Sequence, residues 1–185
     1  MSAVFQQSLQ ALIKSGEGSI DHMYLDTVGK VTVGVGNMLP NAEAAIALGF
    51  LQRSDDAPAS ADQIGQEYEG IFCRMPGQYA ASYRPYTNLY LPEEAINNLL
   101  DTRIGDFQAG LEKSFPNYPG YPEAVKQALM DMAFNLGNAG LVKKFPSLTK
   151  AARNEDWSEC AAQCHRRGIS ASRNEEVEGL FLQAV

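Results

Sequence analysis

Two carboxylates near the amino end of the chain, Glu17 and Asp26, have the surroundings expected of an acid–base pair. Glu17 stands between Gly16 and Gly18 at the expected end of an amphipathic helix, where the backbone can turn away and the side chain can face a cavity. Asp26 directly precedes an expected hairpin turn. Two carboxylates that flank a glycosidic bond can hydrolyse it, because one protonates the leaving oxygen while the other activates water or attacks as a nucleophile.

The strand expected after this turn has an unusual glycine content. Valines at 31, 33 and 35 alternate with Thr32, Gly34 and Gly36, so the valines are expected to face the core. Glycine at two successive positions on one strand face weakens the strand, and the usual reason is close approach of a ligand or of another backbone. We infer a ligand, and expect Thr32, Gly34 and Gly36 to form a bare floor near Asp26.

The stretch from Glu17 to Gly36 resembles the phage-type lysozymes, the glycoside hydrolase family of the T-even phage enzyme. The resemblance implies that Glu17 is the general acid and that Asp26 and Thr32 hold the attacking water. It also implies a two-lobed fold and inverting hydrolysis of the β-1,4 bond between N-acetylmuramic acid and N-acetylglucosamine in peptidoglycan, with no cofactor and no metal. The positions that carry the resemblance are Glu17, Gly18, Tyr24, Asp26, Gly29, Thr32, Gly34 and Gly36, of which Tyr24, Gly34 and Gly36 are expected to contact the substrate.

Two residues of the second half of the chain also match the family. Asn135, just before Gly137, falls where a polar side chain faces the substrate cleft; it could equally cap the end of its helix. Arg173 falls where the family has an arginine that faces the catalytic acid, although a solvated surface charge is the alternative. A cation in the first turn of a helix opposes the helix dipole, so another group should hold Arg173 in place. Burial of Glu17 would then be needed to keep its carboxyl protonated beside an arginine.

Periodicity and helix-breaking residues predict the elements that position these side chains. They indicate an α+β, mainly α, chain. The resemblance implies that this chain forms a lysozyme-like domain over 1–185, with an N-lobe at about 15–90, an interlobe helix at about 92–115, and a C-lobe at about 116–185 that includes helix 2–15. Residues 40–90 look expanded, and the resemblance does not cover them. Further helices are expected at 41–50, 61–74, 122–136 and 157–167, with one or two more within 141–153 that Pro146 breaks. Ser2 is expected to cap the first helix, and a capping box of Ser172 and Glu175 is expected to begin the last one.

Composition limits the partners and the location. The net charge of −7 argues against nucleic acid as a partner and favours a basic protein, such as a cognate immunity protein. No run approaches the length of a membrane span, and the start lacks the charged and apolar regions of a secretory signal. We therefore expect a monomer that is made in the cytoplasm and reaches the cell wall through a holin lesion or a secretion system.

Several side chains have two interpretations. Cys73, Cys160 and Cys164 are expected to be reduced, and Cys160, Cys164 and His165 suggest a metal site only weakly, because no fourth ligand has standard spacing. His22 is expected to be an exposed hairpin residue. Four tyrosines could stack on sugars, but covering the core of the expanded region is the favoured interpretation for Tyr79, Tyr83, Tyr86 and Tyr90.

Two rival functions remain open. A lytic transglycosylase needs the acid but no water-activating carboxylate, so Asp26 and Thr32 weigh against it. A wall-binding module without catalysis, recognised by an immunity protein, is the rival from another class. Within the hydrolase interpretation, the sequence is compatible with a bacteriolytic phage endolysin and with an antibacterial effector of the pesticin type.

Overall fold

The fold was analysed in a computed structural model that describes residues 3–185, so the expected cap at Ser2 lies outside the described residues. The chain is α+β and mainly helical: helices, short 3-10 turns included, hold 61% of the residues, and the strands form one three-stranded and one two-stranded sheet. Contacts divide the chain into two compact units. Unit 1 comprises Met1–Gly16 and Thr102–Val185, and unit 2 comprises Glu17–Asp101.

The three-stranded antiparallel sheet of unit 2 has the order β1-β2-β3, with β1 at Ile20–Leu25, β2 at Val31–Gly34 and β3 at Asn37–Met38. The hairpin predicted around Asp26 is confirmed, since β1 pairs with β2 through Tyr24 opposite Thr32. The sequence did not predict β3, which places Met38 opposite Thr32 on the other edge of β2. Consequently β2 is the central strand.

Both faces of β2 are covered, so the expected bare face is wrong. Thr32 is only 2% exposed, and Gly34 is buried as fully as the valines beside it. A side chain at Gly34 would meet Ile96, whose Cγ2 lies 3.4 Å from the position of a Cβ. Gly34 and Gly36 have positive φ angles of +67° and +65° around the turn into β3, which explains both glycines without a ligand.

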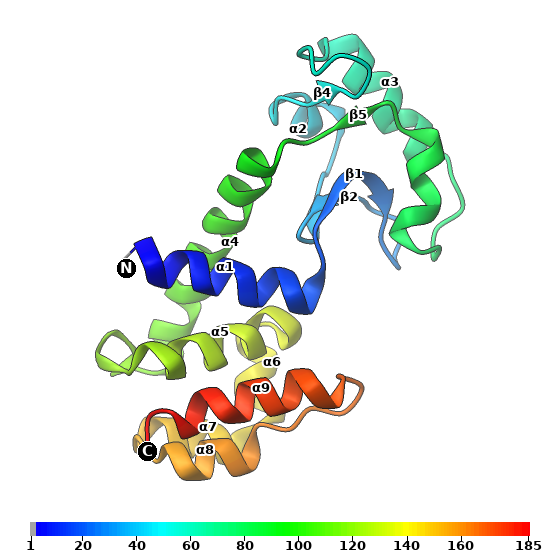
Figure 1. The fold of residues 1–185 in the computed structure, drawn as a ribbon. Helices are drawn as coiled ribbons and strands as arrows, with labels where there is room; N and C mark the ends of the chain where they lie inside the picture. Colours follow the sequence, from blue (N-terminus) through cyan, green and yellow to red (C-terminus); the bar gives the residue numbers. More distant parts are fainter. Residues whose placement is uncertain (1–2) are drawn as a thin grey trace. The chain divides into compact units, whose positions relative to one another are not determined.

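The expanded region of unit 2 is a small subdomain beside this sheet (Figure 1). It contains α2 (Ala42–Ile46), β4 (Leu51–Gln52), α3 (Ala61–Phe72), the 3-10 helix η1 (Ala80–Tyr86) and β5 (Leu89–Tyr90). Helix α3 packs against β1 and β2, and its buried Tyr68 donates a hydrogen bond to the carbonyl oxygen of Leu39. Strands β4 and β5 pair antiparallel.

The long helix predicted for residues 92–115 is confirmed as α4, Glu93–Ser114. It begins after Pro92 with Glu93 and Glu94, and acids in the first turn stabilise a helix through its dipole. Residues 93–101 of α4 belong to unit 2 and residues 102–114 to unit 1.

Unit 1 is helical throughout the described part of the chain: α1 (Ala3–Glu17), α5 (Glu123–Leu136), α6 (Asn138–Lys144), α7 (Pro146–Arg153), α8 (Trp157–Gln163) and α9 (Ala171–Leu182), with the 3-10 turn η2 (Tyr118–Gly120). Helix α9 lies alongside α5 and α8 (Figure 1). The predicted stop at Gly137 is confirmed, because this residue has a φ of +74°. The predicted pair of short helices broken at Pro146 is also confirmed.

The capping box expected at Ser172 and Glu175 is wrong. Helix α9 is capped instead by Ser170, whose backbone is extended and whose Oγ accepts a hydrogen bond from the backbone N–H of Arg173. Ser172 already lies inside the helix. The physical reason is that Ser170 satisfies the N–H of the third helical residue, so the helix starts two residues earlier than the box would allow.

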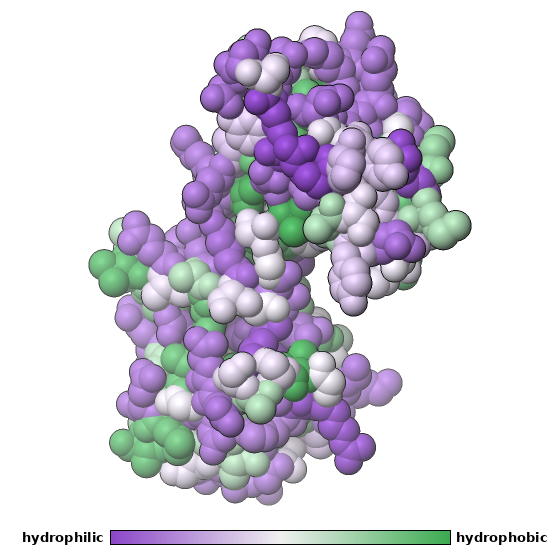
Figure 2. Space-filling view, turned by 45° about the vertical axis from the view of Figure 1, so that its right-hand side comes forward, coloured by the Kyte–Doolittle hydropathy of each residue, from purple (hydrophilic) through white to green (hydrophobic). Residues whose placement is uncertain are grey.

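Figure 2 shows a face that is mainly hydrophilic, with hydrophobic residues in small separate groups. None of the helices within residues 3–185 combines the length and the hydrophobicity that a bilayer crossing requires.

A buried charge cluster joins three segments of unit 1. Asp131, in the middle of α5, has no exposed surface, and its Oδ2 accepts a 2.7 Å hydrogen bond from Nη2 of Arg166. Its Oδ1 accepts hydrogen bonds from Nη2 and Nε of Arg173 at 2.8 and 3.0 Å. The side-chain amide of Asn174 bonds both the N–H and the carbonyl of Arg166. One carboxylate therefore holds α5, the segment after α8, and α9 together.

Replacing Asp131 by alanine is expected to lower the free energy of unfolding by about 3–5 kcal/mol, because Arg166 would stay buried without its counter-ion. Urea denaturation measures this loss. Asp106→Ala, which removes an exposed acid of α4, is the control and is expected to stay within about 0.5 kcal/mol of the wild type. A loss below about 1 kcal/mol for Asp131→Ala would contradict the coupling described.

Candidate functional site

Glu17 is the last residue of α1 and is followed by Gly18, which has a φ of +81°. The prediction that Glu17 ends the helix is confirmed. The residue is exposed, so the burial that a protonated carboxyl beside an arginine would need is not present. The preceding Gly16 has a packing reason to be glycine: a side chain there would collide with the guanidinium group of Arg173.

Asp26 closes the loop between β1 and β2. Its Oδ1 accepts hydrogen bonds from the backbone N–H groups of Val28 and Lys30, at 2.9 and 2.8 Å, and its own N–H donates to the carbonyl of Lys30. The side chain thus has the turn-closing role that is common for aspartate. Its Oδ2 has no hydrogen-bond partner among residues 3–185, so this oxygen is available to a water or a substrate.

Thr32 and Asp26 meet at the backbone of the same residue. The Thr32 hydroxyl donates a 3.0 Å hydrogen bond to the carbonyl oxygen of Lys30, whose N–H is bound by Asp26. Because the Thr32 hydrogen is used in this bond, its oxygen retains lone pairs that can accept. Tyr24, the expected substrate residue opposite Thr32 in β1, is half-buried.

The structure does not show the bare, ligand-facing strand surface expected at Gly34 and Gly36. Ile96 covers Gly34, and Gly36 is an exposed turn residue beyond the end of β2. Contact of these two glycines with a substrate stays a prediction from the resemblance.

Arg173 is held as expected by another group, and the alternative of a solvated surface charge is wrong. Its side chain is 12% exposed and binds Asp131, while its Nη1 donates a 2.9 Å hydrogen bond to the carbonyl oxygen of Gly16. Arg173 belongs to unit 1 and Glu17 to unit 2, so the expected facing of these two side chains stays a prediction.

Asp131 is the charged residue that sequence reasoning missed. A signal was available, because it is a single aspartate among the apolar residues of the predicted buried helix. A buried carboxylate must be paired, and two arginines in the last 25 residues of the chain supply the pairs.

Asn135 lies exposed in the last turn of α5. Within the described chain, its side chain makes no hydrogen bond to the helix end, and Gly137 forms the C-cap. The capping interpretation is therefore wrong, whereas contact with a substrate stays a prediction.

His22 is buried, not exposed as expected. Its Nε2 lies 3.0 Å from the carbonyl oxygen of Ala80, and its Nδ1 lies 3.1 Å from Oδ1 of Asp21, so it ties β1 to η1. Burial raises the pKa of the Asp21 carboxyl, but the hydrogen bonds of this carboxyl with Arg53 and His22 lower it more. The pKa of Asp21 is therefore below its ordinary value. The ring thus has a structural role.

The four tyrosines differ from one another. Tyr83 is buried and donates a 2.7 Å hydrogen bond to the carbonyl oxygen of Met75, which confirms core cover at this position. Tyr79 is 89% exposed and Tyr86 is 51% exposed, so core cover is wrong for both. Tyr90 is half-buried and binds Asp56 through its hydroxyl.

Cys160 and Cys164 are buried thiols. Burial raises the pKa of Cys160 to about 12 and that of Cys164 to about 11. The Sγ atoms face the carbonyl oxygens of Leu148 and Ala161, and His165 pairs with Glu178 at 2.9 Å. In the part of the chain that the structure describes, three or more His, Cys, Asp or Glu residues nowhere gather as a metal site.

Native protein treated with a thiol reagent near neutral pH is expected to react quickly at Cys73, which is exposed. Cys160 and Cys164 are expected to react only on unfolding, because little of their thiolate exists and the reagent cannot reach them. Absorbance of the released thiolate dye measures the rates. Cys73→Ala should abolish the fast phase, and a fast phase of more than one thiol would contradict the burial.

A comparison of the chain with protein-family models and with curated proteins finds no match. Within unit 2, the structure brings Asp26 and Thr32 to one backbone residue and places Glu17 at a helix end three residues before the start of β1, the hairpin strand that contains Tyr24.

Proposed function

We propose that this protein is a peptidoglycan hydrolase that cleaves the β-1,4 bond between N-acetylmuramic acid and N-acetylglucosamine by an inverting mechanism. The observation that carries the proposal is the Asp26 carboxylate, which two backbone N–H groups orient through Oδ1 while Oδ2 has no partner among residues 3–185. The two-lobed lysozyme-like arrangement, with α4 as the interlobe helix, is part of the same proposal.

The two acids have different roles in the proposed reaction. Glu17 protonates the leaving glycosidic oxygen, and the Oδ2 atom of Asp26 accepts a proton from the attacking water. The Thr32 oxygen, which donates its hydrogen to Lys30, accepts a hydrogen bond from the same water. Glu17 is exposed in the absence of substrate, so a bound glycan must exclude water around its carboxyl. Inversion requires the two carboxyl groups to lie about 6.5–9.5 Å apart.

Glu17→Gln is expected to lower the rate of release of muropeptides from purified cell wall by about 10²- to 10⁴-fold, because glutamine cannot donate the proton. Mass spectrometry of the soluble products measures the rate. Glu69→Gln, at an exposed acid of α3, should keep the wild-type rate. Wild-type activity in Glu17→Gln would overturn the assignment and favour a wall-binding module without catalysis.

The same products decide between hydrolysis and transglycosylation. Hydrolysis leaves reducing muramic acid ends, whereas a transglycosylase leaves anhydro-muramic ends, because it uses no water. Asp26 supports hydrolysis, since a transglycosylase needs no second carboxylate to activate water.

Asp26 offers a test that separates its turn-closing role from its chemical role. Asp26→Asn retains an oxygen that can accept from Val28 and Lys30 but removes the negative charge, whereas Asp26→Ala removes both. Asp26→Asn is expected to keep wild-type thermal stability and to lose muropeptide release by about 10²-fold or more. If Asp26→Asn is fully active and only Asp26→Ala is impaired, the carboxylate has a structural role alone.

The charge distribution supports a basic protein partner as part of the proposal. Unit 2 carries twelve acidic and four basic side chains, whereas unit 1 carries ten acidic and eleven basic ones. The negative charge of the protein is therefore concentrated in unit 2. A basic immunity protein would be attracted to unit 2, as expected if this hydrolase is an antibacterial toxin.

A further inference from the structure

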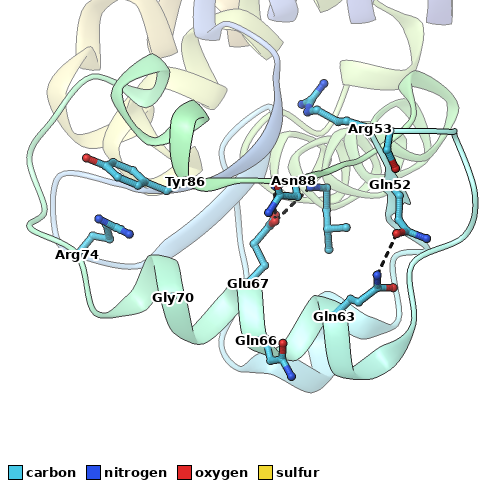
Figure 3. Close-up of a pocket in the computed structure, with 11 residues that line it drawn as sticks. Gln52, Arg53, Gln63, Gln66, Glu67, Gly70, Arg74, Tyr86 and Asn88 are labelled. Carbon is cyan, nitrogen blue, oxygen red and sulfur yellow. Dashed lines mark hydrogen bonds between the residues drawn. The ribbon is translucent and has the colours of Figure 1, made fainter.

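A cavity of about 690 Å³ lies in unit 2 within the region that the family resemblance does not cover. It is bounded by α3, by β4 with the turn that follows it, and by the segment from Tyr86 to Leu89 (Figure 3). Its volume is within the range of about 300–1,000 Å³ that is typical of small-molecule sites. The proposed catalytic residues do not line it.

Hydrogen bonds connect the walls of this cavity. Oε2 of Glu67 accepts from the backbone N–H groups of Asn88 and Leu89, at 2.6 and 3.1 Å, which joins α3 to β5. Nε2 of Gln63 donates a 2.9 Å hydrogen bond to Oε1 of Gln52, which joins α3 to β4. Figure 3 shows these two connections in the middle and at one end of the cavity. These hydrogen bonds fix the walls of the cavity relative to one another.

The lining is polar and rich in groups that both donate and accept hydrogen bonds. Primary amides come from Gln52, Gln63, Gln66 and Asn88. The side chain of Asn88 has no hydrogen-bond partner in the described part of the chain. Amides of this kind match hydroxyl and acetamido groups, since each side can donate and accept.

A flat surface occupies the other end of the cavity. The guanidinium carbon of Arg74 lies 3.5 Å from the centre of the Tyr86 ring, and both side chains are exposed (Figure 3). A stacked guanidinium and aromatic ring can contact the apolar face of a sugar ring. The charges at the cavity are balanced, since Arg53 and Arg74 are matched by Glu67 in the lining and by Asp21, which pairs with Arg53 at 2.8 Å, and this balance favours a neutral ligand.

Gly70 forms part of the α3 wall. A side chain there would meet no atom within 4 Å, so packing does not require a glycine. Glycine within a helix costs about 0.5–1 kcal/mol relative to alanine, and its presence keeps the cavity open. Gly65 in the same helix also has free space, but it does not line the cavity. A large side chain can therefore be placed in the cavity at Gly70, with the same substitution at Gly65 as a control outside the cavity.

We propose that this cavity is a second glycan-binding site, which binds neutral N-acetylglucosamine rings of the β-1,4-linked wall glycan and holds the polymer at a distance from the catalytic residues. The choice of an amino sugar rests on the proposed function, whereas the existence of a neutral saccharide site does not.

The test is a titration with N-acetylchitotriose followed by NMR at the side-chain amides of Gln52, Gln66 and Asn88. All proteins carry Glu17→Gln, so the ligand stays intact whether or not the wild type hydrolyses it. These amide signals are expected to shift and saturate. Gly70→Trp, which fills the cavity, should weaken binding by at least about tenfold, and Gly65→Trp should leave it within about twofold.

Asn88→Ala provides a second variant whose folding is not at risk, because it changes an exposed side chain and leaves the backbone bond to Glu67 intact. It should weaken binding about threefold to tenfold. Unshifted amide signals, or equal binding to Gly70→Trp and Gly65→Trp, would overturn the site. Equal shifts with maltotriose would overturn the amino-sugar assignment. Each result is independent of muropeptide release, which tests the proposed function separately.

Discussion

The helical unit depends on one buried carboxylate. A charge without solvent is stable only when it is paired and hydrogen-bonded, and Asp131 meets this requirement with two arginines from segments more than thirty residues away along the chain. The position of α9 is therefore coupled to that of α5. Arg173 also donates to the carbonyl oxygen of Gly16, so the same cluster fixes the backbone that immediately precedes Glu17. Glu17, the proposed proton donor, therefore directly follows a residue, Gly16, whose backbone is held by the buried ion-pair cluster.

In unit 2, one side chain serves as both a structural and a proposed chemical group. Asp26 has two oxygen atoms with separate uses: Oδ1 closes the hairpin, and Oδ2 has no partner among residues 3–185. A turn aspartate and a water-activating carboxylate are usually opposed interpretations. Here they are compatible, because the turn bonds orient the carboxylate before any substrate binds, and such preorganisation is what a catalytic base requires.

Apart from the capping box of α9, features that depend on nearby residues could be predicted from the sequence, whereas contacts between distant residues could not. The end of α1 at Glu17, the hairpin at Asp26 and the stop at Gly137 follow from local glycine and turn chemistry. The bare strand face failed because Ile96, sixty residues later, covers Gly34. The predicted exposure of His22 was wrong for the same reason, since its partner Ala80 lies far along the chain. The candidate acids were therefore predictable, but what surrounds them was not.

The uneven charge of the protein can be reconciled with an anionic cell wall as the proposed target. Unit 2 carries twelve acidic and only four basic side chains, and three of these four are already engaged: Arg53 pairs with Asp21, Arg74 stacks on Tyr86, and Arg84 donates to the carbonyl oxygen of Thr87. The field around unit 2 is therefore negative, and long-range attraction cannot deliver it to the wall. Short-range binding of neutral sugar rings by amides and an aromatic surface is insensitive to that field. A polar cavity would thus supply wall affinity that charge does not, while the acidic surface of unit 2 would favour the proposed basic protein partner.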